Sequence, residues 1–280
     1  MRQLVACQNL DERGCLVVQE KQYHHLVHVL RVHAGDMIYV RLPSGKLQTM
    51  TVARVAAEKR EVLLQVAGDC PSANLEHSAL HTAHQPSIEL WLFQFVPKPA
   101  KFEQIVRQAV ECGVSVVVPV AGQFCQHSSL TSAHKKAGKT EGRFDRIISE
   151  ARSQSGSPVA TRVHDCINLS EALALWNATN TAEPANAHAE CARAIVLYEQ
   201  SQNTVPLHHA LNKAQSVKKA ALFVGAEGGI SPQELEELKR HGVVPVHFAT
   251  NILRCETAAL YGLAAVQTAL MENGLWQYKE

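Results

Sequence analysis

Short, continuously apolar runs alternate with amphipathic segments from Ile88 onward, and this alternation restricts the fold more than any other feature of the sequence. The runs have the length of strands and lack the polar alternation of a half-exposed sheet. Such an order predicts an α/β fold whose parallel sheet is covered by helices on both faces. The runs are IELWLFQFV at 88, SVVVPV at 115, AIVLYE at 194, AALFVGAEGG at 220 and VVPVHF at 243.

The segments between these runs predict helices, because their apolar residues recur at helical spacing. A third helix is expected near Ser170, and the last helix is expected over Glu256–Met271. The first two helices are predicted from one apolar face each, made of Phe102, Ile105, Val106, Ala109 and Val110 in the first and of Phe144, Ile147, Ile148 and Ala151 in the second.

The first 68 residues follow a different pattern, of short strands around one helix. The segment Glu20–Arg31 has helical spacing, and Gly35-Asp36 is expected to end it before a strand at Met37. The sequence PSGK at 43 predicts a turn between two strands, and a further strand is expected over Glu61–Val66. We therefore predict a small β-barrel at the N-terminus.

A polar stretch without periodicity, residues 69–87, separates these two patterns and contains two prolines. We assign residues 1–72 to the barrel domain, 73–87 to a linker and 88–280 to the α/β domain. Residues 177–190 have the composition of an exposed insertion, and we assign them no function.

Composition excludes several classes of protein. A formal net charge of +1 means that any contact with nucleic acid must be local, although residues 1–68 carry nine Lys or Arg against six Asp or Glu. Eight cysteines without a C-x-x-C pair argue against a zinc ribbon, an iron–sulfur site or a disulfide framework, so no metal is predicted. Because the start of the chain is acidic and no apolar run approaches about 20 residues, we expect a cytoplasmic protein without a membrane partner.

A glycine-rich loop, GAEGG at 225, directly follows an apolar strand and precedes a helix. Glycines let a backbone approach a ligand closely, and Ser231, Pro232 and Glu234 form a capping box with proline at the first helical position. The loop has neither the dinucleotide nor the P-loop pattern. It predicts a ligand site at the end of a parallel strand, and the alternative is a tight turn that binds nothing.

The segment TNILRCETAAL at 250 also follows a short apolar strand. Ile252 and Leu253 beside Arg254 and Glu256 suit a pocket that holds an apolar or aromatic part of a ligand. Alternatively, the two apolar side chains pack under the final helix. The spacing alone leaves both interpretations open.

Together these segments resemble the RsmE family of bacterial ribosomal RNA methyltransferases, which belong to the SPOUT superfamily. The resemblance covers nearly the whole chain. It implies a PUA-like β-barrel and a C-terminal α/β domain tied in a deep trefoil knot, a topology otherwise nearly absent from proteins. Five segments carry it in order: HHLVHVLRVHAGDMIYV at 24, KFEQIVRQAVECGVSVVVPV at 101, EARSQSG at 150, FVGAEGGISPQE at 223 and ILRCETAAL at 252.

The resemblance implies S-adenosylmethionine as the cofactor, held in a bent form by three loops at 197–199, 225–229 and 248–253. It implies a homodimer with the site at the dimer interface. The substrate would be 16S ribosomal RNA in the small ribosomal subunit, methylated at N3 of one uridine. The cofactor residues implied are Leu197, Tyr198, Glu199, Val224, Gly225, Glu227, Gly228, Gly229, Phe248, Ala249, Asn251, Ile252, Leu253, Thr257 and Ala258.

The chain departs from the family pattern at four places. Ala249 replaces a glycine, Cys255 replaces the first threonine of R-T-E-T, and Ala226 replaces a proline. These three changes keep size or shape, so we expect cofactor binding to be preserved. An arginine often found after Q-S-G is missing after Gly156, which calls one RNA contact into question.

Methylation at N3 sets requirements for the side chains. The N3 proton must leave, so the anion needs a cation or hydrogen-bond donors, and Arg254 is our candidate because a guanidinium stays charged. Glu256 is expected to orient Arg254 or to act as a base, and Glu227 is an equal candidate for the base. The uridine must be unpaired or flipped. The predicted RNA contacts are Arg2, Arg31, Lys46, Lys101 and Arg254.

Two rival signals are weaker. His24 and His28 have the spacing of a zinc-protease pair, but His25 stands where H-E-x-x-H needs glutamate. Cys255 as a nucleophile is not needed for methylation at nitrogen. Two alternative functions stay open: a knotted methyltransferase with a different target atom, and a ribosome-assembly RNA binder that has lost catalysis.

Overall fold

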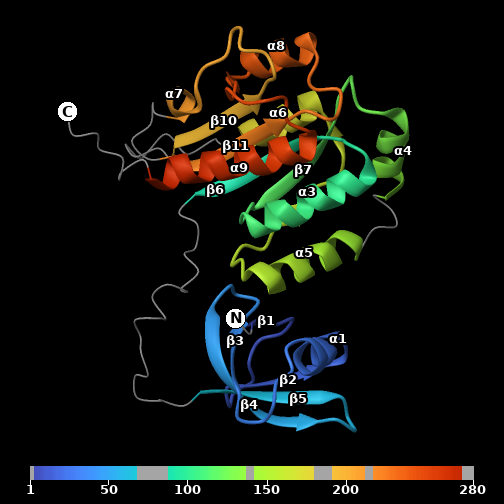
Figure 1. Cartoon of the computed structure of the whole chain (residues 1–280), viewed down its shortest axis with the longest axis vertical. Helices are drawn as coiled ribbons and strands as arrows, with labels where there is room; N and C mark the ends of the chain where they lie inside the picture. Colours follow the sequence, from blue (N-terminus) through green and yellow to red (C-terminus); the bar gives the residue numbers. More distant parts are fainter. Residues whose placement is uncertain (1–2, 68–87, 137–141, 180–190, 212–216, 273–280) are drawn as a thin grey trace, which may run out of the picture. The chain divides into compact units, whose positions relative to one another are not determined.

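The computed structural model describes residues 3–67, 88–136, 142–179, 191–211 and 217–272 (Figure 1). The chain divides into two compact units. An N-terminal unit contains Met1–Gln85 with Ser149–Ala160, and a C-terminal unit contains Pro86–Ile148 with Thr161–Glu280. The predicted linker at 73–87, most of the predicted insertion and the predicted RNA contact Arg2 lie outside the described residues.

The N-terminal unit is built on a five-stranded sheet in the order β1-β3-β4-β5-β2. β1 pairs with β3 in parallel and the other ladders are antiparallel. Within the described residues β1 and β2 stay at opposite edges, so the sheet is a half-barrel around an apolar core. The strands are β1 (Gln3–Val5), β2 (Cys15–Gln19), β3 (Met37–Arg41), β4 (Leu47–Ala56) and β5 (Glu61–Val66).

The helix of this unit is shorter than predicted. It consists of α1 (Glu20–His24) and the π-helical turn η1 (His25–Val29), so the expectation of a helix through Arg31 is wrong. Arg31 has φ of 52°, the left-handed conformation in which a helix commonly ends, and the Val32 N–H donates to the Leu26 carbonyl beyond that end. Glycine usually occupies such a position, which is why the sequence did not reveal the end.

The C-terminal unit confirms the predicted parallel sheet. All of its ladders are parallel, and the strand order is β12-β10-β11-β6-β7-β8, with β9 also paired to β7. Each of the five predicted apolar runs overlaps one of these strands. The strands are β6 (Glu89–Phe95), β7 (Val116–Ala121), β8 (Arg162–Val163), β9 (Ile167–Asn168), β10 (Cys191–Leu197), β11 (Val217–Val224) and β12 (Val244–Val246).

Helices cover both faces of this sheet, as predicted. α3 and α9 lie side by side over one face (Figure 1), and α6 and α8 contribute to an aromatic core on the other. The five apolar residues predicted for the first helix are the buried residues of α3. The helices are α3 (Pro99–Glu111), α4 (His127–Lys136), α6 (Leu169–Ala178), α7 (Leu207–Leu211), α8 (Pro232–Arg240) and α9 (Cys255–Glu272). α5 (Arg143–Ser155) belongs to the C-terminal unit up to Ile148 and to the N-terminal unit from Ser149.

The strand order brings three loops together at one edge. β12, β10 and β11 are neighbours and parallel, so the segments that follow them leave the sheet at the same carboxyl edge. α9 packs closely against β10 and β11, because Gly262 has no side chain. A Cβ there would lie 2.7 Å from a methyl carbon of Leu197 and 2.9 Å from one of Leu222. Among the described helices, none is long and apolar enough to cross a membrane.

Candidate active site

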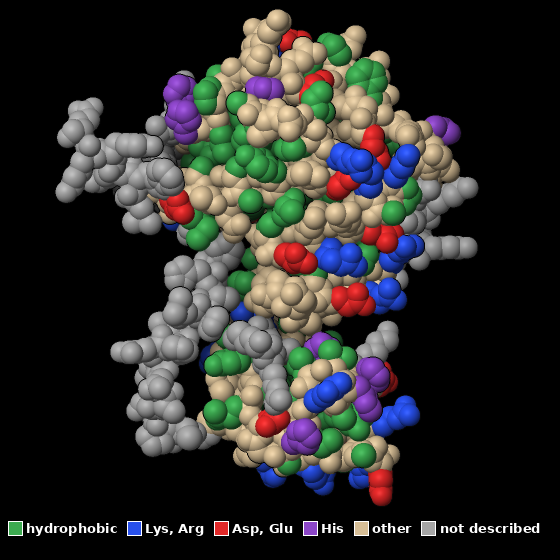
Figure 2. All heavy atoms as spheres, in the orientation of Figure 1, with side chains coloured by type: hydrophobic (Ala, Val, Ile, Leu, Met, Phe, Trp, Pro, Cys, Tyr) green, Lys and Arg blue, Asp and Glu red, His purple; other side chains and the backbone are tan. Residues whose placement is uncertain are grey.

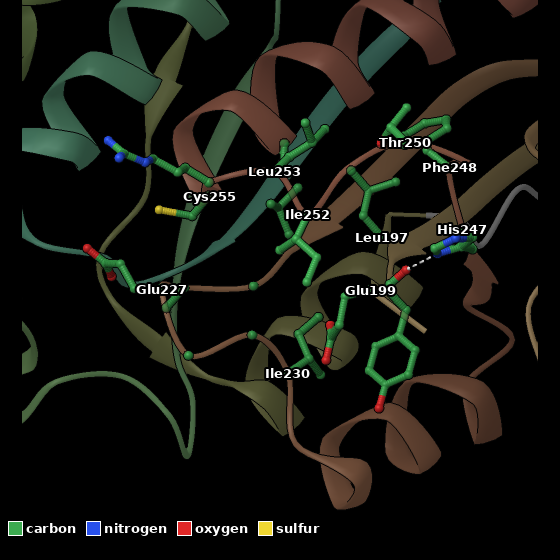
Figure 3. Close-up of a pocket in the computed structure, with 18 of the residues that line it drawn as sticks. Leu197, Glu199, Glu227, Ile230, His247, Phe248, Thr250, Ile252, Leu253 and Cys255 are labelled. Atoms are coloured by element: carbon green, nitrogen blue, oxygen red, sulfur yellow. Dashed lines mark hydrogen bonds between the residues drawn. The ribbon is translucent and has the colours of Figure 1, made fainter. Parts of the chain in front are cut away.

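A cavity of about 460 Å³ lies at this carboxyl edge, within the C-terminal unit (Figure 3). Its volume falls in the range of small-molecule sites. Three loops form it, those that follow β10, β11 and β12, together with the first turn of α3. The lining residues are Lys101, 197–199, 224–230, 246–248 and 250–255, with Ala258 from α9.

Most residues predicted to hold a cofactor line this cavity. Ala249 and Thr257 do not, although their neighbours in the sequence do. Lys101, predicted as an RNA contact, also lines the cavity. Six lining residues were absent from the predicted sets, namely Ala226, Ile230, Val246, His247, Thr250 and Cys255. Ala226 and Thr250 lie within the predicted loops 225–229 and 248–253, and the other four lie close to the ends of these loops.

The glycine-rich loop keeps its shape because side chains would not fit. A Cβ on Gly225 would lie 2.8 Å from the backbone carbonyl carbon of Gly229, and Gly229 itself has φ of 76°. A Cβ on Gly228 would lie 2.8 Å from the Cβ of Phe124, an aromatic residue that is 45% exposed. At these three glycines the loop therefore presents its backbone to the cavity.

Three polar side chains fix the ends of this loop. The buried Gln94 amide donates to the carbonyls of Val224 at 3.2 Å and Gly225 at 3.0 Å. On the far side, the Ser231 hydroxyl accepts the Glu234 N–H at 3.3 Å and the Glu234 carboxylate accepts the Ser231 N–H at 2.9 Å. The predicted capping box is thus confirmed, and it starts α8 directly after the loop.

One wall of the cavity is apolar. Leu197, Ile230, Ile252 and Leu253 come from three different loops, and Figure 3 shows them around the same space. Ile252 is 86% exposed, so it does not pack under the final helix. The structure therefore favours the pocket interpretation of this segment. Such a wall suits a flat apolar or aromatic part of a ligand.

The opposite end of the cavity is charged. The Lys101 ammonium lies 3.0 Å from a Glu256 oxygen and 3.6 Å from a Glu227 oxygen, and the Lys98 N–H donates to Glu227 at 3.2 Å. Figure 2 shows basic and acidic side chains clustered where α3 and α9 begin, next to hydrophobic side chains over α9. Glu256 was expected to orient Arg254, but its ion-pair partner is Lys101, which approaches from α3.

These contacts set the protonation states at this end. Burial, and then a hydrogen bond to Glu256, raise the pKa of the Cys255 thiol to about 12. Burial works to raise the pKa of Glu256 as well, but hydrogen bonds from its own backbone, Lys101 and Cys255 outweigh burial, and the net pKa is lowered. The hydrogen bond to Glu256 raises the pKa of Lys101. At neutral pH the thiol is protonated and the Lys101–Glu256 pair is charged.

Arg254 lines the cavity in a different way. It is exposed, and within the described part of the chain its guanidinium makes no hydrogen bond or ion pair. Arg31 and Lys46 belong to the N-terminal unit, where both are exposed. Within the described residues Arg254 is therefore an unpaired cation, whereas Lys101, the other cation of the cavity, is paired with Glu256.

The two histidines with zinc-protease spacing do come together. The rings of His24 and His28 have centroids 4.7 Å apart on the exposed side of α1 and η1. Within the described residues, however, no group of three His, Cys, Asp or Glu side chains could hold a metal ion. The pair therefore gives no basis for a metal site.

The residues that line the cavity belong to a segment that matches a known protein family. An RNA methyltransferase domain model matches residues 84–267. The Ribosomal RNA small subunit methyltransferase E of Bacillus subtilis is 25% identical over 271 residues, which cover 95% of each chain. The protein of Borreliella burgdorferi named Ribosomal RNA small subunit methyltransferase E 2 is 26% identical over 278 residues, covering 98% of this chain and 99% of that protein.

The fold has a similar counterpart among solved structures. The Ribosomal RNA small subunit methyltransferase E of Neisseria gonorrhoeae, solved bound to S-adenosyl methionine, superposes with a TM-score of 0.71 at 21% identity. The match covers 96% of this chain and 97% of that one. At this level of identity the likeness concerns the fold.

Proposed function

Because the chain belongs to the RNA methyltransferase domain family, we propose that it transfers a methyl group from S-adenosylmethionine to N3 of one uridine in 16S ribosomal RNA. The observation that carries the proposal is the cavity itself, in which three loops at one edge of a parallel sheet join an apolar wall to a charged end. The two curated relatives, named for methylation of small-subunit ribosomal RNA, support the choice of substrate.

The residues of the cavity fit S-adenosylmethionine. The apolar wall of Leu197, Ile230 and Ile252 suits an adenine ring, and the glycine-rich loop lets backbone groups reach the ligand. The carboxylate of Glu199 suits its positive ammonium group. When bound, the cofactor supplies an electrophilic methyl group on a sulfonium. The sulfur leaves as a neutral thioether and needs no metal ion to do so.

Arg254 is proposed to stabilise the uracil anion that forms as N3 loses its proton. A free guanidinium can donate to a uracil carbonyl without breaking an existing ion pair, and Arg254 has no partner within the described residues. Lys101 is less suited to this role, because it is held by Glu256. We assign to Lys101 and Glu256 the role of fixing the start of α9, and with it the position of Arg254.

Glu227 is proposed as the base that takes the N3 proton. Its carboxylate lines the cavity, whereas Glu256 does not line it and has a lowered pKa that makes it a weaker base. Cys255 is 5% exposed and protonated, so it is proposed to take no covalent part in the reaction.

The proposal extends to the rest of the molecule. The half-barrel is proposed to be a PUA-like RNA-binding domain over residues 1–72, with Arg2, Arg31 and Lys46 on the RNA backbone. The C-terminal unit is proposed to carry the SPOUT trefoil knot and to form a homodimer. The activity belongs in the cytoplasm, where small ribosomal subunits are found.

The proposal can be tested with purified protein. Small subunits from cells lacking the protein are incubated with S-adenosylmethionine carrying a labelled methyl group, and the RNA is digested to nucleosides. We expect label in N3-methyluridine, a loss of at least about 100-fold in kcat for Arg254→Ala, and no change for Lys218→Ala, an exposed lysine at the amino end of β11. Label in another nucleoside would contradict the N3 assignment. Absence of both cofactor binding and label would favour an RNA binder without catalysis.

A further inference from the structure

A second cavity, of about 520 Å³, lies along the part of the C-terminal sheet formed by β7 and β8, with Pro119 of β7 and Arg162 and Val163 of β8 in its lining. The cofactor loops take no part in it. Its walls come from the segment after β6, from α4, from the start of α5 and from the segment that runs through β8 to Cys166. All of these residues belong to the C-terminal unit.

The inner walls of this cavity are apolar and partly aromatic. Phe102 and Phe144 meet edge to face, with ring centroids 5.5 Å apart and ring planes at 88°. Phe102 is buried, whereas Phe144 is half-buried and contributes to the cavity wall. Pro97 and Pro119 add further flat apolar surface. A planar ring can stack or pack against such walls.

The rim of the cavity carries charges of both signs that are not engaged. Arg162, Asp145 and Asp165 are exposed and line the cavity. Within the described residues none of these three side chains makes a hydrogen bond or an ion pair. The cavity therefore offers a free guanidinium and two free carboxylates around an aromatic interior.

The first turn of α3 separates this cavity from the cofactor cavity. Val96, Pro97, Pro99 and Phe102 line the second cavity, whereas Lys101 lines the first. The two cavities thus share one short segment of chain as a common wall. An RNA strand with one base in the first cavity would therefore have its neighbouring nucleotides close to the second cavity.

We propose that the second cavity binds one unpaired nucleotide of the RNA substrate, near the methylated one, whose base carries an exocyclic amino group. The base packs on Phe144, its amino group donates to Asp165, and a phosphate pairs with Arg162, which lies on the same segment of the cavity lining as Asp165. Carboxylates accept hydrogen bonds but cannot donate them, so uracil, whose one base-pairing donor, N3–H, lies between two carbonyl oxygens, is the poorest match. The inference rests on the proposed function, because it takes RNA as the substrate.

Enzyme kinetics on intact small subunits test the inference. We expect Arg162→Ala and Asp165→Asn each to raise KM for the subunit about tenfold, the size of one lost charge-assisted hydrogen bond, with kcat within about twofold of the wild type. Lys218→Ala removes an exposed charge at the amino end of β11, outside the lining of the cavity, and should leave both constants unchanged. Wild-type KM in both variants would overturn the inference.

A direct binding measurement separates this inference from the proposed function. The full chain is saturated with S-adenosylhomocysteine to fill the first cavity and is then titrated with AMP, CMP, GMP and UMP. At least one amino-bearing nucleotide should bind more tightly than UMP, and Arg162→Ala and Asp165→Asn should abolish the difference. If the wild type methylates subunits but no nucleotide binds in this way, the proposed function stands and the second site falls.

Discussion

Lys101 joins three side chains at the charged end of the cofactor cavity. Its ammonium lies within ion-pair distance of Glu256 and Glu227, and within 3.9 Å of the Cys255 sulfur. Burial raises the pKa of the Cys255 thiol, whereas hydrogen bonds outweigh burial at Glu256 and lower the pKa of its carboxylate, a difference that the sequence alone does not show. Two predictions at the scale of single residues follow from these pKa shifts.

The Cys255 thiol should be unreactive at neutral pH. Because its pKa is raised to about 12, the thiolate is a negligible fraction of the population at pH 8, and the side chain is also buried. Iodoacetamide at pH 8 should label the exposed Cys7 and spare Cys255, as measured by peptide mass spectrometry. Cys255→Ser should keep kcat within about threefold. Rapid labelling of Cys255, or loss of activity in this variant without loss of fold, would show that the thiol takes part in the chemistry.

Glu256→Gln should destabilise the protein in a pH-dependent way. A lowered carboxylate pKa means that the ion pair with Lys101 stabilises the fold above the ordinary glutamate pKa and is lost as the pH falls through the lowered value. We expect a loss of about 1 kcal/mol in the free energy of unfolding at pH 7, shrinking toward acid pH. Urea unfolding at several pH values measures this.

The control for this prediction is Glu236→Gln. Glu236 pairs with Lys239 at 2.7 Å on α8, where both side chains are more exposed than Lys101 and Glu256. Water screens such a pair, so this change should have less effect. Equal losses in the two variants, or a loss in Glu256→Gln that does not depend on pH, would contradict the role given to the pair.

At the scale of elements, the glycine-rich loop between β11 and α8 connects the fold to the cavity. Gly225→Ala places a Cβ 2.8 Å from the backbone of Gly229, which cannot give way as a flexible side chain could. We expect at least tenfold weaker binding of S-adenosylmethionine, measured by calorimetry. Gly242→Ala is the control, because Gly242 has φ of 79° but open space around it. It should cost stability by about 1 kcal/mol without changing the affinity, and equal affinity in both variants would refute this view of the loop.

Elements with strong local signals could be predicted from the sequence. Continuous apolar strands, the apolar face of α3 and the capping box at Ser231 were recognisable because a period or a motif specifies them. The short strands β8 and β9 were not, because pairs of residues at the edge of a sheet carry no period. The helix end at Arg31 was missed because a non-glycine residue adopts a left-handed conformation there.

The parts of the candidate site that consist of consecutive residues could be predicted, whereas contacts between segments that are distant in the sequence could not. The loops after β10, β11 and β12 could be anticipated as strand ends. The ion pair between Lys101 and Glu256 could not, because 155 positions separate these residues in the sequence and only the packing of α3 against α9 brings them together. The second cavity could not be predicted for the same reason, because segments distant in the sequence form its walls.

At the scale of the whole molecule, the low net charge limits how the protein holds RNA. A formal charge of +1 excludes a broad basic surface, and the proposed backbone contacts are few. The logarithm of the affinity for a ribosomal RNA fragment should therefore fall against the logarithm of the salt concentration with a slope of only about −2 to −4, corresponding to roughly three to five phosphates. Filter binding at KCl concentrations from about 50 to about 300 mM measures this slope. A slope near about −10 would indicate an extensive basic surface that this account lacks.

The proposed activity is methylation of N3 of a uridine in small-subunit ribosomal RNA. Mass spectrometry of 16S ribosomal RNA from cells with the gene deleted tests it most directly, with the same cells supplied again with the wild type or with Arg254→Ala. The account predicts that N3-methyluridine is missing after deletion, returns with the wild type and stays missing with the variant. N3-methyluridine at its normal level in the deleted cells would contradict the account.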